Sequence, residues 1–375
     1  MRRLTVSAHG GGDFRRIQDA LNSIPDDCAE RTVIAVMNGT YREKLRIDKP
    51  FVSLIGQDAS RTIVTYDDFA LKTFADGELY HAFHSYTLLV AADDFTAERL
   101  TFENKAGAGE DVGQALAAYV DADRVCFRAC RFIGLQDTLF TGPLPPAPRD
   151  RPAFGGPRDL FPRRPVRQYY ERCTIEGDVD FIFGSATAVF SDCDIVSRRP
   201  GWITAASTPK GARYGYVFAG CRLIGDAPEK SVYLGRPWRN DAKVVFLDCW
   251  LGGHIAPEGW SIWNEAESLR DVEFAEFGSC GPGADGGSRV GWSKRLTREE
   301  AAAYSVQRVL AGNDGWDPEQ PYDGWRPSDR GASRPISIFF GGRLYFVRIW
   351  RGPVPEARLG TGAPSFIRRP RRCRQ

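Results

Sequence analysis

The sequence predicts an all-β protein built as a solenoid of short strands, and three observations support this fold class. A cysteine-centred motif recurs along the middle of the chain. Between Gly and Asn breaks, short runs alternate β-branched and aromatic residues. Amphipathic helical segments stand near both ends of these runs, where a solenoid needs its apolar ends and open strand edges covered.

The repeat is clearest in the segments FRACRFIG, YERCTIEG, VFSDCDIVS, VFAGCRLIG and VFLDCWLGG. Cys173, Cys193, Cys221 and Cys249 are spaced by 20, 28 and 28 residues, a period typical of solenoids. Because equivalent residues stack from coil to coil, we interpret the cysteines as an inward ladder of small apolar side chains. They form no CxxC pair, so we expect no zinc site.

The N-terminal side continues the strand pattern in RTVIAVMNGTY, FVSLIGQDA and RTIVTYD. Before these runs, DFRRIQDALNSIP predicts a helix with Phe14, Ile17, Leu21 and Ile24 on one face and Asp13 as its N-cap. We expect this helix to cover the first coil. At the other end, TREEAAAYSVQRVL predicts one helix that starts with a capping box, Thr297 with Glu300, and packs on the outside.

Two segments interrupt the pattern and set the domain organisation. Thr141–Arg167 is rich in Pro, Arg and Gly and predicts a long loop inserted between two coils. Residues 321–375 lack the repeat, and the 50 residues from Arg326 carry 12 arginines against two acids. We therefore expect a solenoid domain over 1–320 and a basic tail over 321–375 that is disordered or a gene-model artefact. Within the tail, ISIFFGGRLYFVRIW suggests a strand pair.

Composition and missing motifs exclude several functions. The net charge of +2 gives no sign of nucleic-acid binding, and no apolar stretch of about 20 residues predicts a membrane span. The N-terminus lacks the apolar core of a signal peptide, which favours a cytoplasmic protein; the alternative is a secreted protein whose leader is missing from the gene model. There is no G-x-S-x-G elbow, P-loop or dinucleotide fingerprint, and HAFH (81–84) lacks a third ligand, so we expect no metal and no cofactor.

What remains for chemistry is a set of carboxylates and amides in apolar strand patterns. GLQDTLF holds Gln136 and Asp137, and GDVDFIFG holds Asp178 and Asp180. The two segments are separated by one coil and the inserted loop, so we expect them on adjacent coils, with strands about 4.8 Å apart. GQALAAYVDAD adds Gln114 from an earlier coil, and YLGRPWR adds Arg236 and Trp238 from a later one, which predicts a column of polar groups across the coils.

Strand alternation places Asp178, Asp180 and Ile182 on one face of GDVDFIFG and Val179, Phe181 and Phe183 on the other. The acids can then face a groove instead of the core. Phe183 can share that groove with Asp180 only if the strand bends. We interpret Asp178 as a turn or substrate-rim carboxylate.

GQALAAYVDAD, GLQDTLFTG, GDVDFIFGSATAVF and YLGRPWR, in this order, resemble the four signature regions of pectin methylesterases, and GDFRRIQDALNSIP and GTYREKLRI resemble the start of that catalytic domain. The resemblance runs from about Val6 to Pro318. It implies a right-handed parallel β-helix that releases methanol from methyl-esterified homogalacturonan or oligogalacturonides. The loop Thr141–Arg167 is longer than in plant members, and the tail has no counterpart. We expect a monomer that binds neither nucleic acid nor membrane.

By the same resemblance, Asp180 is the nucleophile and Asp137 the general acid and then base. Gln114 and Gln136 resemble the donors to the oxyanion. Arg236 is expected to lower the pKa of Asp180 and keep it ionised. Trp238, Phe183 and Val179 are the expected substrate contacts.

Two alternatives stay open from the residues. Another pectin-active β-helix enzyme, a polygalacturonase or a lyase, would create reducing ends or unsaturated products instead of methanol. A carbohydrate-binding solenoid without activity would show no difference between the wild type and Asp180→Ala.

Overall fold

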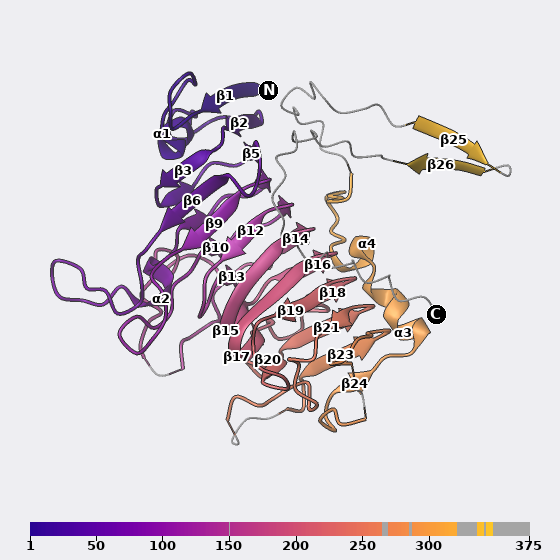
Figure 1. The fold of residues 1–375 in the computed structure, drawn as a ribbon. Helices are drawn as coiled ribbons and strands as arrows, with labels where there is room; N and C mark the ends of the chain where they lie inside the picture. Colours follow the sequence, from indigo (N-terminus) through magenta and orange to yellow (C-terminus); the bar gives the residue numbers. More distant parts are fainter. Residues whose placement is uncertain (150, 265–268, 285–286, 321–335, 341–342, 348–375) are drawn as a thin grey trace, which may run out of the picture. The chain divides into compact units, whose positions relative to one another are not determined.

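The computed structural model describes residues 1–149, 151–264, 269–284, 287–320, 336–340 and 343–347 (Figure 1). The chain divides into two units, Met1–Tyr322 and Asp323–Gln375. In the second unit, β25 (Ile336–Phe340) and β26 (Arg343–Val347) pair in antiparallel fashion, which confirms the predicted strand pair. The rest of the basic tail, and the prediction that it is disordered, lies outside the described residues.

The first unit is a parallel β-helix, as predicted. One parallel sheet, called sheet A here, takes one short strand from each coil. Its strands, in spatial order, are β1 (Arg2–Val6), β2 (Thr32–Val36), β5 (Val52–Gly56), β8 (Thr96–Glu98), β11 (Val125–Arg128), β14 (Arg167–Glu171), β16 (Thr187–Ser191), β18 (Tyr216–Ala219), β21 (Lys243–Leu247), β23 (Glu273–Phe277) and β24 (Lys294–Arg295).

The other large sheet has two branches, B1 and B2, which share the long strands β15 (Thr174–Gly184) and β17 (Asp194–Ala206). Branch B1 also contains β3 (Gly39–Arg42), β6 (Thr62–Tyr66), β9 (Thr101–Asn104), β12 (Arg131–Ile133), β19 (Arg222–Gly225) and β22 (Trp250–Leu251). Branch B2 also contains β4 (Leu45–Ile47), β7 (Leu88–Val90), β10 (Ala118–Val120), β13 (Leu139–Thr141) and β20 (Val232–Pro237).

An aromatic stack runs along the inside of sheet A and explains the repeat. It consists of one ring per coil, three residues before each cysteine of the motif: Phe127, Tyr170, Phe190, Phe218 and Phe246. Successive rings are stacked and nearly parallel, with interplanar angles of 6°, 12°, 8° and 9° and centroids 5.3, 4.7, 4.5 and 4.4 Å apart. The repeat in the sequence is therefore the register of the coils.

The cysteines form the inward ladder that the sequence predicts. Cys130, Cys173, Cys193, Cys221 and Cys249 are buried in the same core and are free thiols. The sulfur of Cys221, for example, donates to the carbonyl of Phe190 in the preceding coil over 3.2 Å. Burial raises the pKa of the Cys173 thiol well above its usual range, which suits a structural role and not a reactive one.

The residue before each ladder cysteine makes the corner between sheet A and branch B1. Arg172, Asp192 and Asp248 adopt the left-handed conformation, with φ of 52°, 53° and 51°. Gly220 has φ of 64° at the equivalent position, where glycine pays no Cβ penalty. The small or polar residue in the motif is therefore the corner of each coil.

The N-terminal helix is shorter than the sequence suggests. It forms as α1 (Ile17–Asn22), and Ile17 and Leu21 are buried as expected. The prediction that Asp13 caps it is wrong, because Asp13 accepts from the backbone N–H of Thr5 over 2.7 Å. The carboxylate of Glu43 instead accepts from the first helical N–H groups, those of Ile17 and Gln18, each at 3.0 Å.

The predicted C-terminal helix is three short pieces: α3 (Arg298–Ala301), η1 (Ala302–Tyr304) and α4 (Val306–Val309). The capping box of Thr297 and Glu300 is present. Ser305 is extended, with ψ of 152°, and its side chain caps α4. It therefore interrupts the segment that the hydrophobic periodicity predicts as one helix. Val309 packs with residues on the outer side of sheet A, which confirms the outside position. None of the helices among the described residues is long and apolar enough to span a membrane.

Candidate active site

A cavity of about 330 Å³ opens on the outer side of branch B2 and contains both predicted catalytic carboxyls. The strands that supply it lie side by side in the order β10, β13, β15, β17 and β20 (Figure 1). The lining residues are Ala82, Phe83, Gln114, Gln136, Asp137, Pro148, Arg149, Arg151, Phe154, Asp180, Phe183, Ala205, Arg236, Trp238 and Trp263. The predicted column of Gln114, the Gln136–Asp137 pair, Asp180 and Arg236 with Trp238 is therefore brought together.

Asp180 stands at a break in strand β15. Its φ of 50° is left-handed, and the register of β15 against β17 shifts between Gly177 and Ile182. Phe181 and Ile182 both enter the main core, which simple alternation forbids, and Phe183 returns to the outer face. The strand thus bends as required for Asp180 and Phe183 to share one cavity. Such local strain is typical of functional positions.

Arg236 holds the Asp180 carboxylate with two parallel hydrogen bonds. Nε donates to Oδ1 over 3.0 Å and Nη2 donates to Oδ2 over 2.7 Å. The guanidinium lies between two indole rings, 3.8 Å from the centroid of Trp202 and 3.9 Å from that of Trp263. The two hydrogen bonds and the two rings fix the direction of the carboxylate.

Arg236 lowers the pKa of Asp180, as expected from the sequence, but burial raises that pKa by more. Burial raises the pKa of Asp180, and the hydrogen bonds and charge of Arg236 lower it only in part, so the net direction is upward from 3.8. The side chain is only 7% exposed, and this desolvation was not readable from the sequence. Arg236 therefore limits a rise in pKa that burial causes.

Asp137 shares the cavity without an equivalent partner. Its backbone is left-handed too, with φ of 63°, and its N–H donates to the carbonyl of Val179 over 3.0 Å. Burial raises the pKa of Asp137 well above its ordinary value, and the nearby charge of Asp180 raises it further. No hydrogen bond joins its carboxyl group to the described residues. Asp137 is therefore the acid of the pair that keeps its proton at higher pH.

Gln114 and Gln136 bring two amides into the same cavity from adjacent coils. The N–H of Ala115 donates to the carbonyl of Gln136 over 3.2 Å, which ties the two segments together. Within the described part of the chain, neither side-chain amide has a hydrogen-bond partner, although both line the cavity. Both can therefore donate to an oxygen bound beside Asp180.

Aromatic rings form the apolar wall of the cavity. Phe183 lies 5.8 Å from Trp238 and 6.2 Å from Phe83 between ring centroids, and Phe154 lies 6.2 Å from Trp238. Ala205 pairs in register with Phe183 on one side and Arg236 on the other, so a small side chain separates the wall from the ion pair.

Two residues singled out in the sequence lie outside this lining. Val179 is half-buried and pairs with Trp202 in the register of β15 and β17. Asp178 is buried and forms an ion pair with Arg199, with Oδ2 and Nη2 2.9 Å apart, and its Oδ1 accepts from the N–H of Val179. It lies within strand β15 and not in a turn.

The insert, Thr141–Arg167, contributes Pro148, Arg149, Arg151 and Phe154 to the cavity. Its middle is anchored by a buried ion pair in which Arg158 donates to Asp121 over 3.0 Å. Where the insert leads into β14, Arg167 binds Asp123 with Nη2 and Oδ2 2.7 Å apart. The insert is thus fixed to coil turns at two points.

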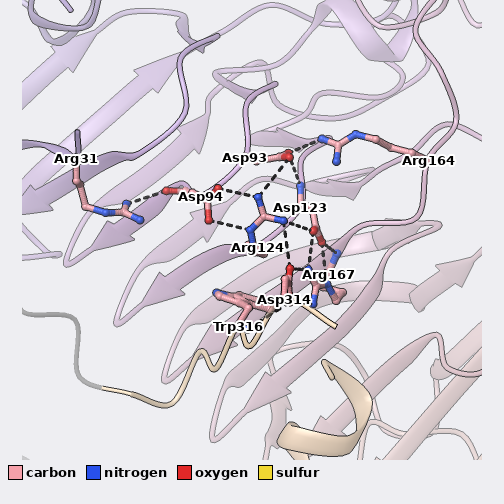
Figure 2. A network of polar contacts seen from close by, with 9 residues as sticks. All are labelled: Arg31, Asp93, Asp94, Asp123, Arg124, Arg164, Arg167, Asp314 and Trp316. Atoms are coloured by element: carbon pink, nitrogen blue, oxygen red, sulfur yellow. Dashed lines mark hydrogen bonds and ion pairs between the residues drawn. The ribbon is translucent and has the colours of Figure 1, made fainter. Parts of the chain in front are cut away.

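Figure 2 shows the wider network at this second point. Arg124 lies among four carboxylates, those of Asp93, Asp94, Asp123 and Asp314. Arg164 of the insert also binds Asp93. The network joins successive coil turns, the end of the insert and the segment after α4.

The short helix α2 (His81–His84) closes the other side of the cavity through Ala82 and Phe83. The insert packs so closely on it that a Cβ on Gly156 would lie 2.4 Å from Cβ of Phe83, and one on Gly155 2.7 Å from Cδ2 of His81. This explains the paired glycines of the insert. Among the described residues, no group of three or more metal-ligating side chains is found, at HAFH or elsewhere.

Five residues in or beside the site were not predicted from the sequence: Phe83, Arg149, Arg151, Trp202 and Trp263. Trp202 stands in the bulged half of β17, where alternation fails, and Trp263 follows the last B2 strand in an irregular segment. The run AFGGP in the insert was the one available signal, because paired glycines beside an aromatic residue suggest close packing.

The chain is similar to known proteins over most of its length. The family model described as Pectinesterase matches residues 3–143 and 151–313. Pectinesterase 31 from Arabidopsis thaliana is 35% identical over 330 residues, which cover 85% of this chain and 93% of that protein. The structure of pectin methylesterase PemA from Erwinia chrysanthemi is 27% identical with a TM-score of 0.69, covering 86% of this chain and 99% of that one.

A second solved structure, a pectin methylesterase in complex with hexasaccharide VII, is 28% identical with a TM-score of 0.69, covering 86% of this chain and 99% of that one. Residues 144–150 of the insert lie outside the family match.

Proposed function

Because the chain belongs to the pectinesterase family, we propose that its two buried carboxyls divide the hydrolysis of a pectin methyl ester between nucleophile and acid. The chain is a carboxylic ester hydrolase that acts on the methyl esters of pectin. The observation that carries the assignment of roles is the contrast between Asp180, paired with Arg236, and Asp137, unpaired in the same cavity with a strongly raised pKa.

Asp180 is the nucleophile. Its Oδ attacks the C6 ester carbonyl of a galacturonate unit, and the carbonyl π electrons move to the oxygen. Gln114 and Gln136 donate to this oxyanion, and their amides have no competing partners among the described residues. The pairing with Arg236 keeps Asp180 the more acidic of the two carboxyls and aims its oxygens.

Asp137 moves the protons. When the tetrahedral intermediate collapses, the bond to the methoxy oxygen breaks and protonated Asp137 gives its proton to the departing methanol. Its carboxylate then takes a proton from a water molecule that attacks the acyl carbon of the mixed anhydride. Asp180 leaves as a carboxylate, and the galacturonic acid product loses its proton to solvent. No cofactor is needed for either half of the reaction.

The aromatic wall is the proposed sugar contact. Trp238 and Phe183 present ring faces and edges beside the two carboxyls, and Phe154 adds a third ring from the insert. Val179 lies next to the catalytic strand break but is not part of the cavity lining, so its role as a substrate contact stays a prediction.

We further propose that the insert limits how long a galacturonan chain the enzyme accepts, acting as a monomer on methyl-esterified homogalacturonan or on shorter oligogalacturonides. Four insert residues line the cavity, and two ion-paired anchors hold them there. A structure of a related pectin methylesterase contains a hexasaccharide, so a chain of several sugars fits that relative.

Methanol release from methylated galacturonans of graded length tests this proposal. We expect methanol without new reducing ends or unsaturated products, and a lower kcat/KM on polymer than on short oligomers. Phe154→Ala, which opens the wall without cutting the chain, should raise the polymer rate relative to the oligomer rate. Cleaved chains would refute the esterase assignment, and equal ratios for the variant and the wild type would refute the length limit alone.

A further inference from the structure

Arg151 is a cation of the cavity without a partner in the described structure. Its side chain is half-buried and lines the same cavity as Asp137 and Asp180. No hydrogen bond or ion pair joins its guanidinium to the described residues. Burial lowers the pKa of Arg151, and the charge of Asp159 offsets this only in part. A guanidinium carries five N–H donors, and those of Arg151 are available to a ligand in the cavity.

The charged neighbours of Arg151 are already engaged. Asp159 accepts from the N–H of Gly155 over 3.0 Å and forms an ion pair with Arg163, 3.3 Å away. Arg236 is committed to Asp180 through both of its hydrogen bonds. Arg149 donates to the carbonyl of Trp238 over 2.6 Å. Of the three arginines that line the cavity in the described structure, Arg151 is thus the one whose guanidinium has no hydrogen bond or ion pair with the described residues.

Arg151 belongs to a segment that other parts of the fold hold in place. The insert that carries it is anchored by the Arg158–Asp121 pair and packs on α2 through Gly155 and Gly156. Arg151 lines the cavity together with Ala82 and Phe83 of α2. Residues 144–150, just before Arg151, lie outside the family match, which resumes at Arg151.

We propose that Arg151 forms a carboxylate-binding subsite, which holds a free galacturonate unit next to the methyl ester that is being hydrolysed. This inference rests on the proposed function and names the substrate form that the same cavity favours. A guanidinium binds a carboxylate through two parallel hydrogen bonds, and a methyl ester offers no negative charge for this. The subsite also offsets the repulsion between a free carboxylate and ionised Asp180.

The test compares wild type, Arg151→Gln and Arg164→Gln. Arg164 is a matched control because it lies in the same insert, removes the same charge, pairs with Asp93 and does not line the cavity. The first readout is calorimetric binding of trigalacturonate, the free tri-acid, at fixed salt. The second is the ratio of kcat/KM on a partly esterified trimer to that on the fully methylated trimer, measured by methanol release.

A charge-assisted pair is worth about 1.5–3 kcal/mol, or roughly a 10- to 100-fold change. Arg151→Gln should weaken trigalacturonate binding by at least about tenfold and lower the ratio to a similar degree. Arg164→Gln should change neither by more than about twofold. Equal losses of binding in the two variants would show a general effect of charge and not a subsite at Arg151. Unchanged binding in Arg151→Gln would also overturn the proposed subsite. Calorimetry needs no turnover, so it reports on the subsite even if no methanol is released, an outcome that refutes the proposed function instead.

Discussion

Arg236 donates to both carboxylate oxygens of Asp180, over 3.0 and 2.7 Å, while its guanidinium is stacked between the rings of Trp202 and Trp263. The pair joins strands β15 and β20, which are not neighbours, because β17 lies between them. Ala205 on β17 leaves the space through which the arginine reaches the aspartate. This arrangement sets the direction and the acidity of Asp180, the proposed nucleophile.

Replacing Arg236 tests whether this residue controls the pKa of Asp180. In Arg236→Lys one cation remains but the bidentate geometry is lost, so the pKa of Asp180 rises further. The acid limb of kcat/KM should therefore move to higher pH, and kcat should fall roughly 10- to 100-fold. Arg222→Lys is the control, since Arg222 binds Asp194 with the same geometry, 2.7 and 2.6 Å, outside the cavity. Equal pH profiles for the two variants would contradict the role of Arg236.

Replacing Trp202 tests whether its stacking on the guanidinium of Arg236 matters for catalysis. Trp202 does not line the cavity but lies 3.8 Å from the guanidinium, so it acts on substrate only through Arg236. A cation–π contact is worth about 0.5–2 kcal/mol, so Trp202→Leu should lower kcat roughly 3- to 30-fold and leave KM within about twofold. Trp316→Leu removes a similar contact from Arg167, 5.3 Å away, and should leave kcat unchanged. A change in KM alone would show that Trp202 binds substrate instead.

Asp137 links activity to stability. The folded-state pKa of Asp137 lies well above the unfolded value of about 3.9. Its contribution to the free energy of unfolding is therefore fully present below that unfolded value, and it is lost as the pH rises through the folded-state pKa. Because asparagine does not titrate, the Asp137→Asn variant does not lose this part of its stability as the pH rises. The Tm advantage of the variant over wild type should therefore be larger at pH 8 than at pH 4, while methanol release falls at least about a hundredfold. A Tm difference that does not grow with pH would contradict the raised pKa.

Gly156 tests the position of the insert. A Cβ at this residue would lie 2.4 Å from Cβ of Phe83, so Gly156→Ala must push the insert away from α2. We expect kcat/KM on methylated oligomers to fall about tenfold, because Phe154 and Arg151 move with the insert. Gly291→Ala is the control, since nothing lies within 4 Å of its added Cβ. Steady-state methanol assays of both variants decide the question.

The solenoid could be predicted from the sequence because the same types of residue pack at the same positions in successive coils. The aromatic ring three residues before each cysteine, the left-handed corner and the buried thiol all leave a local signal. The insert was readable from its composition for the opposite reason, since Pro, Arg and Gly break that signal. The start of α1 was not readable, because its first N–H groups bind Glu43, in the link between β3 and β4, and not a residue of its own flank.

The site was readable in part. The motifs identified which side chains meet, since adjacent coils must align Asp137 with Asp180. They did not reveal that Asp180 is buried, because burial depends on the insert and α2 closing over the column. Nor did they reveal Trp202 and Trp263, whose contact with Arg236 arises from irregular segments that no repeat specifies.

The most direct measurement is methanol release from methylated galacturonan by Asp180→Asn and Asp178→Asn, two substitutions on one strand. Both carboxylates are buried and paired with arginine, but only Asp180 lines the cavity. We predict that Asp180→Asn lowers kcat at least about a thousandfold and that Asp178→Asn keeps it within about fivefold, with both proteins folded by circular dichroism. Similar rates for the two variants, or the larger loss in Asp178→Asn, would contradict Asp180 as the nucleophile.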